Sequence, residues 1–405
     1  MITVVTTRLE PSSSEPNSLG HRAVNTLIMA SCLVPEMEGK PYLSNLFKKI
    51  TNIENFEESY KQTIKGKSKY KKEALVFSKD AVYNLENLRQ KVINRTYKFS
   101  GYNRFTVYEP KERIIDAPGF EDKIVQIAIN NILKSVYYPC FIFSSYACID
   151  NKGTHKCVDR IQHYIRKAKW QYGEDAFFVN LDIKKFFYNI DRKILKSLLA
   201  KKINCENTLD LIYKIINSAD SISPKGMPLG NTLSQICANI DMNELDQYSK
   251  RKLSLKYYVR YADDVVIIVE NRKIAKEIQS KLIKFLDKSL NLKPNKRKTQ
   301  IFPINQGINT VGFKIYATHR LLRNDSKKKI KRKCKKMRRL IIDKNMTQEK
   351  AEQILNSWKG HAEHGNSYNF IQTLLKKNDY ITLNKEGIFK IDIKIINKER
   401  GNSDI

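Results

Sequence analysis

Two short runs of apolar, β-branched and aromatic residues flank a pair of adjacent aspartates, and they form the most informative pattern in the chain. The first run spans residues 257–261 and the second spans residues 265–269. Such composition is typical of strands, whereas Asp is depleted from strand interiors. The pattern therefore predicts a buried hairpin whose turn presents Asp263 and Asp264 where the core opens to solvent.

A third aspartate changes the meaning of this pair. The apolar run over residues 177–181 ends at Asp182. A strand that delivers an aspartate at its end, beside a hairpin that presents two more, builds the carboxylate cluster that two-metal phosphoryl transfer requires. Hard oxygen ligands of this kind suit Mg²⁺. The pair in the turn also has a purely structural explanation, because Asp is a common turn residue.

Elsewhere the spacing of apolar residues predicts helices. In the clearest case they recur at Val82, Leu85, Leu88 and Val92. Asn231 is placed to cap another of these helices. Helices are expected over residues 81–93, 122–133, 192–203, 209–216, 232–253, 274–286, 351–358 and 367–375. Extended structure is expected over 96–107 and 389–395, the latter without an evident purpose.

The charge of the chain indicates a polyanionic partner. Its 74 Lys and Arg against 42 Asp and Glu give a net charge of +32, far more than solubility needs. Ten of the thirteen residues from 327 to 339 are basic. Like charges repel one another along a helix, whereas binding to phosphates releases counterions. The candidates for nucleic-acid contact here are Lys328, Lys331, Arg332, Lys335 and Arg338. The Lys-rich run at 65–72 is either a solvated face or a phosphate contact.

Other classes of protein are not favoured. The longest apolar stretch near the N-terminus, residues 24–34, is too short to span a membrane, and no membrane partner is expected. The seven cysteines are odd in number and include no Cys-x-x-Cys pair, which indicates neither a disulfide framework nor a zinc site. We therefore expect reduced thiols in a cytoplasmic protein.

Three segments, in order and spacing, resemble the palm motifs of reverse transcriptases. They are the run ending at Asp182, the sequence Tyr-Ala-Asp-Asp at 261–264, and Gly-Met-Pro-Leu-Gly-Asn-Thr-Leu-Ser-Gln at 226–235. The resemblance extends from about residue 85 to about residue 375. It implies an α+β right-hand polymerase fold, whose palm has an antiparallel sheet with flanking helices. The implied parts are an N-terminal extension (1–70), fingers (71–178), a palm (179–316, with 192–225 partly in the fingers), a helical thumb (317–380) and a C-terminal tail (381–405).

The resemblance also assigns roles to single residues. Asp182, Asp263 and the carbonyl of Ile183 would hold two Mg²⁺ ions, with Mn²⁺ as an alternative, and Asp264 would support the site. Phe187 is at the position of the steric gate that excludes a ribose 2′-hydroxyl. The expected contacts to the incoming nucleotide are Lys111, Arg113, Phe187, Gln235 and Lys298. The expected contacts to template and primer are Gly153, Thr154, Gly230, Asn231 and Gly312, together with the basic residues of 327–339.

Several of these residues have plainer explanations that the sequence leaves open. Lys111 and Arg113, two apart on one side of a strand, are also typical of an exposed hairpin tip. Gly153 and Thr154 also fit an ordinary turn, and Phe187 also fits the core. Lys298 is either an acid near the pyrophosphate or a solvated phosphate contact. His361 and His364, in a stretch similar to a thumb signature of the same enzymes, are RNA contacts or packing residues.

The loop at 228–235 narrows the resemblance within the family. Pro228-Leu229-Gly230 followed by Ser234-Gln235 resembles the enzymes of diversity-generating retroelements, which are related to group II intron-like reverse transcriptases, although Thr232 and Leu233 are transposed. This implies a cognate non-coding template RNA, dNTPs, a cDNA product with errors at template adenines, and a small helical accessory protein. The alternatives are an antiphage defence reverse transcriptase with its own non-coding RNA, and a non-catalytic RNA-binding protein.

Overall fold

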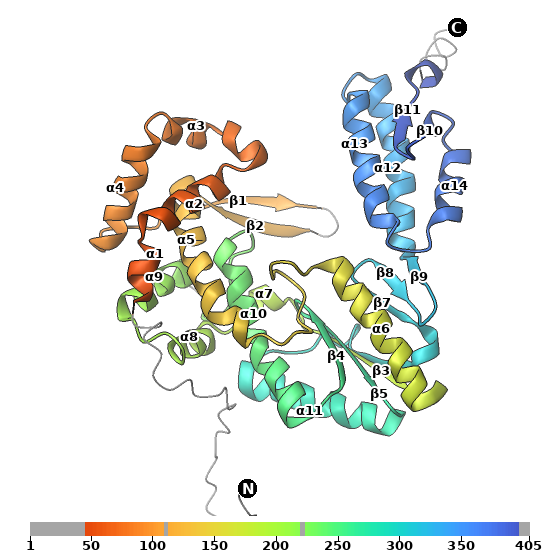
Figure 1. Cartoon of the computed structure of the whole chain (residues 1–405), viewed down its shortest axis with the longest axis horizontal. Helices are drawn as coiled ribbons and strands as arrows, with labels where there is room; N and C mark the ends of the chain where they lie inside the picture. The colour runs from red at the N-terminus through yellow and green to blue at the C-terminus, as the bar shows by residue number, and fades with distance from the viewer. Residues whose placement is uncertain (1–44, 109–111, 219–222, 397–405) are drawn as a thin grey trace, which may run out of the picture. The chain divides into compact units, whose positions relative to one another are not determined.

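The computed structural model describes residues 45–108, 112–218 and 223–396 (Figure 1). Its α-helices are α1 (Leu46–Ile50), α2 (Ile53–Thr63), α3 (Lys72–Ser78), α4 (Ala81–Ile93), α5 (Phe120–Tyr137), α6 (Thr154–Tyr172), α7 (Phe186–Asn189), α8 (Arg192–Ala200), α9 (Glu206–Asn217), α10 (Thr232–Gln247), α11 (Arg272–Leu290), α12 (Asn324–Ile342), α13 (Gln348–Ala362) and α14 (Tyr368–Lys376). Its strands are β1 (Tyr102–Val107), β2 (Arg113–Pro118), β3 (Phe177–Asp182), β4 (Tyr257–Tyr261), β5 (Asp264–Val269), β6 (Gln300–Pro303), β7 (Ile308–Thr310), β8 (Phe313–Ile315), β9 (Arg320–Leu322), β10 (Ile381–Leu383) and β11 (Phe389–Ile391).

A four-stranded antiparallel sheet in the order β4-β5-β3-β6 places the three aspartates at one edge. The predicted hairpin forms as β4 and β5, with Ala262 and Asp263 in its turn and Asp264 at the start of β5. Asp182 is the last residue of β3 and lies directly opposite Asp264. The alternation of side chains along a strand explains this register, because a slip of one residue would expose the buried face.

Both faces of this sheet are covered by helices, as Figure 1 shows. Val179 and Leu181 of β3 share a hydrophobic cluster with buried residues of α10 and α11. Phe178, which points to the other side, belongs to a second cluster with the buried residues of α6. The sheet is therefore fixed from both sides, and its edge at the aspartates opens into a cavity.

The predicted helices form, with differences at their ends. The helix expected over 81–93 is confirmed as α4, where Leu85, Leu88 and Val92 are buried. Val82 is the exception, because it lies in the first turn and is 83% exposed. The Asn231 cap is confirmed, since its side chain accepts a hydrogen bond of 2.8 Å from the Leu233 N–H.

Two small sheets and a helical cluster complete the described chain. β1 and β2 form an antiparallel hairpin, and β7, β8 and β9 form a three-stranded sheet. Helices α12, α13 and α14 enclose a third hydrophobic cluster, to which Phe389 and Ile391 of β11 belong. The strand expected over 389–395 is thus shorter, because residues 393–396 are helical, and it helps to close this core. No helix in the described ranges is long and apolar enough to cross a membrane.

Candidate active site

A cavity of about 1270 Å³ lies at the edge of the sheet where the aspartates meet. Six of the predicted site residues line it together: Arg113, Asp182, Ile183, Phe187, Asp263 and Lys298. Its other basic walls come from two segments, residues 184–185 and residues 293–297, and from Lys284. A polyanionic ligand such as a triphosphate is the chemistry that this charge favours. Lys111 lies outside the described residues.

Burial and mutual repulsion dominate the electrostatics of the three carboxylates. Asp182 is only 2% exposed, although it ends a strand. Burial raises the pKa of Asp263, and the charge of Asp182 raises it further. Burial, a hydrogen bond with Asp182 and the charge of Asp263 together raise the pKa of Asp264 well above its usual range. Such a cluster is stabilised by any cation that it can hold.

Two side chains from the segment before β6 hold the carboxylate of Asp182. The Lys298 ammonium forms an ion pair with its Oδ2, and the Asn295 amide donates a hydrogen bond of 2.8 Å to its Oδ1. Burial alone would lower the pKa of Lys298, but the hydrogen bond and the charge of Asp182 outweigh it, so the pKa is raised. Sequence reasoning missed Asn295, because nothing in its spacing links it to a residue 113 positions away.

The donor set suits a hard divalent cation, since it offers carboxylate oxygens and a neighbouring carbonyl, that of Ile183. Among the residues at 45–108, 112–218 and 223–396, however, no three His, Cys, Asp or Glu side chains converge as a formed metal site would. In this arrangement both oxygens of Asp182 already have partners, Lys298 and Asn295. A metal ion at Oδ2 would meet the Lys298 ammonium as a competing cation.

The two adjacent phenylalanines after β3 separate into different environments. Phe186 is buried in the core, whereas Phe187 is half-buried, and both line the cavity. The Met227 N–H donates a hydrogen bond of 2.7 Å to the Phe187 carbonyl, which fixes the backbone at that point. Phe187 thus lines the same cavity as Asp182 and Ile183, and its role as a gate stays a prediction.

The glycine-bearing loop after residue 226 contacts the β1–β2 hairpin. The Asp116 N–H donates a 2.6 Å hydrogen bond to the Leu229 carbonyl. Gly230 has φ +107°, and a Cβ there would lie 2.8 Å from the Ile115 side chain. A side chain at Gly230 would therefore clash with β2, so close packing explains this glycine, and its expected contact with template and primer stays a prediction.

Asn231 also has a structural role in place of the predicted nucleic-acid contact. It is only 2% exposed, and its amide donates to the Tyr102 hydroxyl (3.1 Å) while its oxygen caps α10. Gln235, on the exposed side of α10, lines a separate cavity of about 380 Å³ together with Lys65 and Lys134. The structure does not bring Gln235 to the aspartates.

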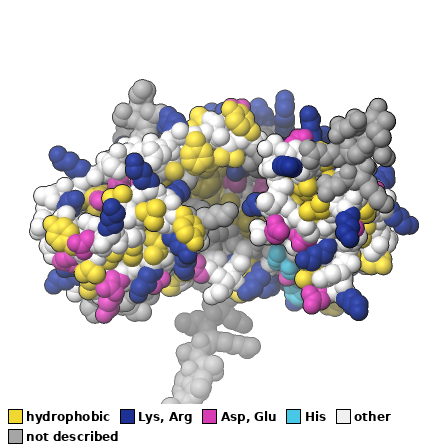
Figure 2. Space-filling model, turned by 90° about the horizontal axis from the view of Figure 1, so that it is seen from above, with side chains coloured by type: hydrophobic (Ala, Val, Ile, Leu, Met, Phe, Trp, Pro, Cys, Tyr) yellow, Lys and Arg dark blue, Asp and Glu magenta, His cyan; other side chains and the backbone are white. Residues whose placement is uncertain are grey.

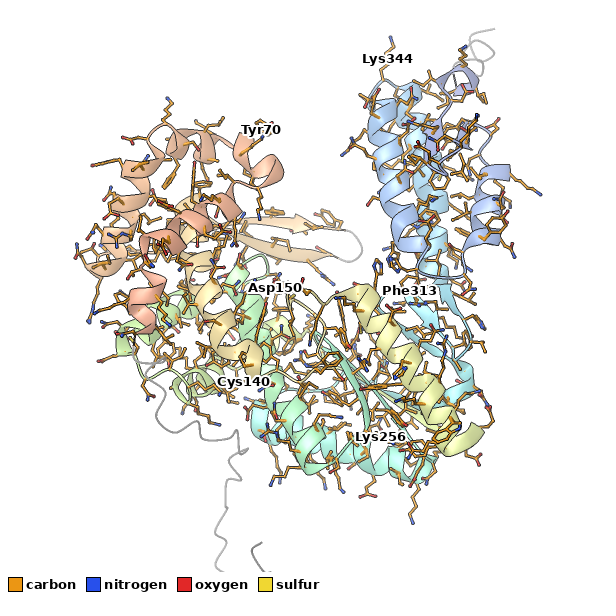
Figure 3. All side chains as sticks on the ribbon, viewed as in Figure 1. Tyr70, Cys140, Asp150, Lys256, Phe313 and Lys344 are labelled. Atoms are coloured by element: carbon orange, nitrogen blue, oxygen red, sulfur yellow. The ribbon has the colours of Figure 1, made fainter. Side chains whose placement is uncertain are left out.

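A further cavity of about 650 Å³ adjoins the aspartate hairpin from the side of α6. Thr154 and Gly312 line it, and the Thr154 hydroxyl lies 3.1 Å from that of Tyr261. Gly153 precedes this helix with φ +117°. Figure 2 shows a group of histidine side chains on the visible face. The rings of His155 and His364 stack with their centroids 3.3 Å apart. His361 packs against Phe313, which Figure 3 labels.

The basic residues predicted on the helix at 327–339 lie on α12. Lys328, Lys331, Arg332 and Lys335 are exposed and free to meet a phosphate backbone. Arg338 differs, because its guanidinium lies over the Tyr380 ring at 5.2 Å and 3.8 Å from Asp379. It therefore packs within the helical cluster, which corrects its expected nucleic-acid role.

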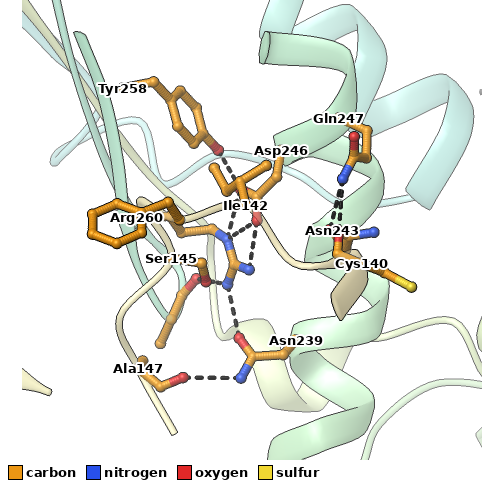
Figure 4. A network of polar contacts seen from close by, with 12 residues as sticks. Cys140, Ile142, Ser145, Ala147, Asn239, Asn243, Asp246, Gln247, Tyr258 and Arg260 are labelled. Atoms are coloured by element: carbon orange, nitrogen blue, oxygen red, sulfur yellow. Dashed lines mark hydrogen bonds and ion pairs between the residues drawn. The ribbon is translucent and has the colours of Figure 1, made fainter. Parts of the chain in front are cut away.

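A buried polar network that the sequence did not reveal supports the aspartate hairpin (Figure 4). Arg260 and Asp246 form an ion pair with both side chains fully buried. Arg260 also donates hydrogen bonds to Asn239 (3.0 Å) and to the carbonyl of Ala262 (3.1 Å), the left-handed residue of the turn. The Tyr258 hydroxyl completes the network at Asp246, 2.7 Å away. An Arg inside an apolar run is the sequence signal that could have revealed it.

Comparison with known proteins gives one family. Residues 108–315 match the family model described as "Reverse transcriptase (RNA-dependent DNA polymerase)". Protein YkfC of Escherichia coli K12 is 27% identical over 290 residues, which cover 60% of this chain and 72% of that protein. The group II intron-encoded protein LtrA of Lactococcus lactis is 26% identical over 273 residues. That match covers 51% of this chain and 44% of LtrA, so this chain spans less than half the length of LtrA.

Solved structures of telomerase also resemble the chain. The apo enzyme from Candida tropicalis gives a TM-score of 0.46 at 11% identity, covering 73% of this chain and 64% of that one. Telomerase of Candida albicans with a fragment of telomeric RNA gives a TM-score of 0.42 at 12% identity, covering 72% of this chain and 58% of that one.

Proposed function

Because the chain belongs to the reverse transcriptase (RNA-dependent DNA polymerase) family and has its right-hand fold, we propose that it copies an RNA template into cDNA at the cavity of Asp182. One observation carries the proposal. Asp182 at the end of β3 and Asp263 in the β4–β5 turn, 81 positions apart, line one large basic cavity, and Asp264 lies directly opposite Asp182 in the sheet. A structural turn has no need for a third carboxylate placed opposite the first pair.

Asp182, Asp263 and the carbonyl of Ile183 would hold Mg²⁺, or Mn²⁺ in its place, with Asp264 in support. When bound, two such ions would lower the pKa of the primer 3′-hydroxyl and neutralise the charge on the leaving pyrophosphate. The residues of the chain orient the reactants. Arg113, in the cavity wall, binds the triphosphate of a dNTP in bidentate fashion, and Lys298 binds it as a point charge.

The remaining walls set selectivity and hold the nucleic acid. The ring of Phe187 lies beneath the sugar and excludes a ribose 2′-hydroxyl, while Thr154 and Gly312 contact the primer–template duplex. The exposed Lys and Arg side chains of α12 bind the phosphate backbone of this duplex. This binding weakens as the salt concentration rises.

The biological setting that we propose is a diversity-generating retroelement. The support is the sequence Leu229-Gly230-Asn231 with Ser234-Gln235. In that setting the template is a cognate non-coding RNA, the cDNA carries errors at template adenines, and a small helical protein assists. An antiphage enzyme would instead copy a dedicated RNA faithfully or repetitively.

Replacement of two aspartates tests the activity. The double variant Asp263→Ala with Asp264→Ala should lose dNTP incorporation by more than about 10³-fold, equivalent to about 4 kcal/mol. Its affinity for the template RNA should stay within about twofold, because these side chains repel phosphate. Retained synthesis would refute the site. A matched control is Asp287→Ala, which removes a carboxylate from the same cavity wall and should leave synthesis nearly unchanged.

Sequencing tests the setting. The protein is purified with the RNA that it retains, and that RNA is sequenced. After addition of dNTPs and Mg²⁺, the cDNA is sequenced too. Errors concentrated at template adenines would support diversification. Faithful or repetitive cDNA from one non-coding RNA would instead support an antiphage defence enzyme.

A further inference from the structure

The segment 293–299, which precedes β6, wraps around the end of β3. The Lys184 N–H donates a 3.0 Å hydrogen bond to the Lys293 carbonyl, and the Asn295 N–H donates a 2.7 Å hydrogen bond to the Asp182 carbonyl. The Asn295 side chain then donates to Asp182 Oδ1 at 2.8 Å. Asn295 therefore holds both the main chain and the side chain of the same aspartate.

These contacts make the two oxygens of the Asp182 carboxylate unequal. Oδ1 is tied to a side chain whose own backbone is fixed, so this bond sets the rotation of the carboxylate. Oδ2 meets the Lys298 ammonium, which sits on a flexible stem. The Asp182 side chain is 3% exposed and that of Lys298 is 48% exposed. Lys298 can thus leave into water without unpacking the core, whereas Asp182 cannot move.

We propose that Asn295 is a positioning residue that fixes Asp182 Oδ1, so that Oδ2 is the oxygen at which a divalent cation replaces Lys298. This inference rests on the proposed function, because it assigns the metal site to Asp182. Lys298 acts as the resident counter-cation of Asp182 and offsets part of the negative charge of the carboxylate cluster until the metal arrives. Once displaced, its ammonium is released toward the cavity that receives the triphosphate.

The chemistry of an amide suits this task. The Asn295 N–H₂ donates a hydrogen bond but carries no charge, so it orients the carboxylate without competing for the cation. A carboxylate at this position would add a further like charge to the cluster. A lysine would place a second permanent cation on Asp182. Partners that orient a metal ligand in this way typically contribute about 10–100-fold to metal affinity.

Binding of Mn²⁺ alone, followed by electron paramagnetic resonance on the full chain without nucleotide, tests the inference. Asn295→Ala should weaken Mn²⁺ binding about 10-fold or more. Lys298→Ala should tighten it, because the competing cation is gone. The opposite signs separate orientation from a general loss of structure. In primer extension, excess Mn²⁺ should restore the activity of Asn295→Ala but not that of Lys298→Ala.

Asn180→Ala is the matched control. The Asn180 amide also holds this segment, through a 3.1 Å hydrogen bond to the Lys298 carbonyl, but no described contact joins it to the Asp182 carboxylate. The Asn180→Ala variant should change the affinity for Mn²⁺ by less than twofold. An equal loss in Asn180→Ala and Asn295→Ala would overturn the inference, because folding of the segment would then explain both.

The variant Asp182→Asn distinguishes a failure of the positioning role from a failure of the proposed metal site. If Asp182→Asn binds Mn²⁺ as tightly as the unmodified chain, the proposed metal site is wrong and the inference falls with it. If Asp182→Asn loses Mn²⁺ but Asn295→Ala does not, the site stands and only the positioning role is refuted.

Discussion

Two ion pairs lie at opposite ends of one functional region, and they are built differently. Arg260 and Asp246 are both fully buried, and three donor groups converge on the carboxylate of Asp246 at 2.7–3.0 Å. At Asp182 the carboxylate is equally buried, but its cation, Lys298, is half in water. The first pair supports the β4–β5 hairpin from within, and the second lies at its tip.

The difference teaches which electrostatic contacts can change during a reaction. Removing one partner of a buried pair strands a charge in a medium of low dielectric, so such a pair is permanent. A pair with one exposed partner can exchange that partner for another cation, since water solvates the departing cation and the incoming one keeps the buried carboxylate paired. The sheet thus combines a permanent pair beside the β4–β5 turn with an exchangeable pair at the end of β3. Four variants, taken from the largest expected effect to the smallest, test this comparison.

Asp182→Asn should abolish synthesis while leaving the fold intact. We expect incorporation of dNTPs to fall by more than about 10³-fold, equivalent to about 4 kcal/mol. The free energy of unfolding should not fall by more than about 1 kcal/mol, because the change also removes a like charge opposite Asp264. Primer extension and urea denaturation measure the two effects. A large loss of stability would show that the pair of Asp182 and Lys298 is structural as well.

Arg260→Met should destabilise the chain by about 3–5 kcal/mol, because Asp246 would remain buried without its cation. Urea denaturation measures this loss. The double variant Arg260→Met with Asp246→Leu should recover most of the lost stability, since no buried charge remains. If the single variant is as stable as the unmodified chain, the pair is not the permanent support described above.

Asp241, which lies on α10 like Asp246, is a third buried carboxylate to compare. Neither of its oxygens has a hydrogen-bond partner among the described residues. Burial raises its pKa to about 8. The folded chain therefore keeps a proton that the unfolded chain releases above pH 4, and stability is lost as pH rises from about 4 to about 8.

Asp241→Asn removes this dependence. The stability of the variant relative to the unmodified chain should increase by roughly 3 kcal/mol between pH 5 and pH 7, because a raised pKa changes the free energy of unfolding by about 1.4 kcal/mol per pH unit. Thermal or urea unfolding at several pH values measures the difference. A difference that stays constant with pH would place a cation beside Asp241.

Lys298→Ala should lower the free energy of unfolding by clearly less than Arg260→Met does, because Asp182 keeps the hydrogen bond from Asn295 and borders a cavity that a solvent cation can enter. Urea denaturation at low and high salt measures it. A loss as large as that of Arg260→Met would erase the distinction between the two pairs.

The sequence predicted the elements that follow from periodicity and local capping. The β4–β5 hairpin, Asp182 at the end of β3, helix α4 and the Asn231 cap all depend on neighbouring residues, and the structure has them. Six of the site residues predicted from the motifs also line one cavity, the one beside Asp182.

What the sequence did not predict depends on long-range packing. Asn295 and Asp246 gain their roles from contacts that only the assembled sheet creates. The space beside Gly230 is filled by β2, and Gln235 faces a different cavity from the aspartates. In each of these two cases the motif was recognised, but the direction in which the residue points is set by elements far away in the chain.

The β10–β11 hairpin has a consequence for how the protein folds during its synthesis. The Asn356 side chain makes hydrogen bonds to both the N–H (2.8 Å) and the carbonyl (3.0 Å) of Phe389. The last strand of the catalytic sheet, by contrast, ends at Pro303. On the ribosome the sheet can therefore assemble about 90 residues before α13 acquires its final partners. Until then the cluster of α12, α13 and α14 keeps an apolar side open to water.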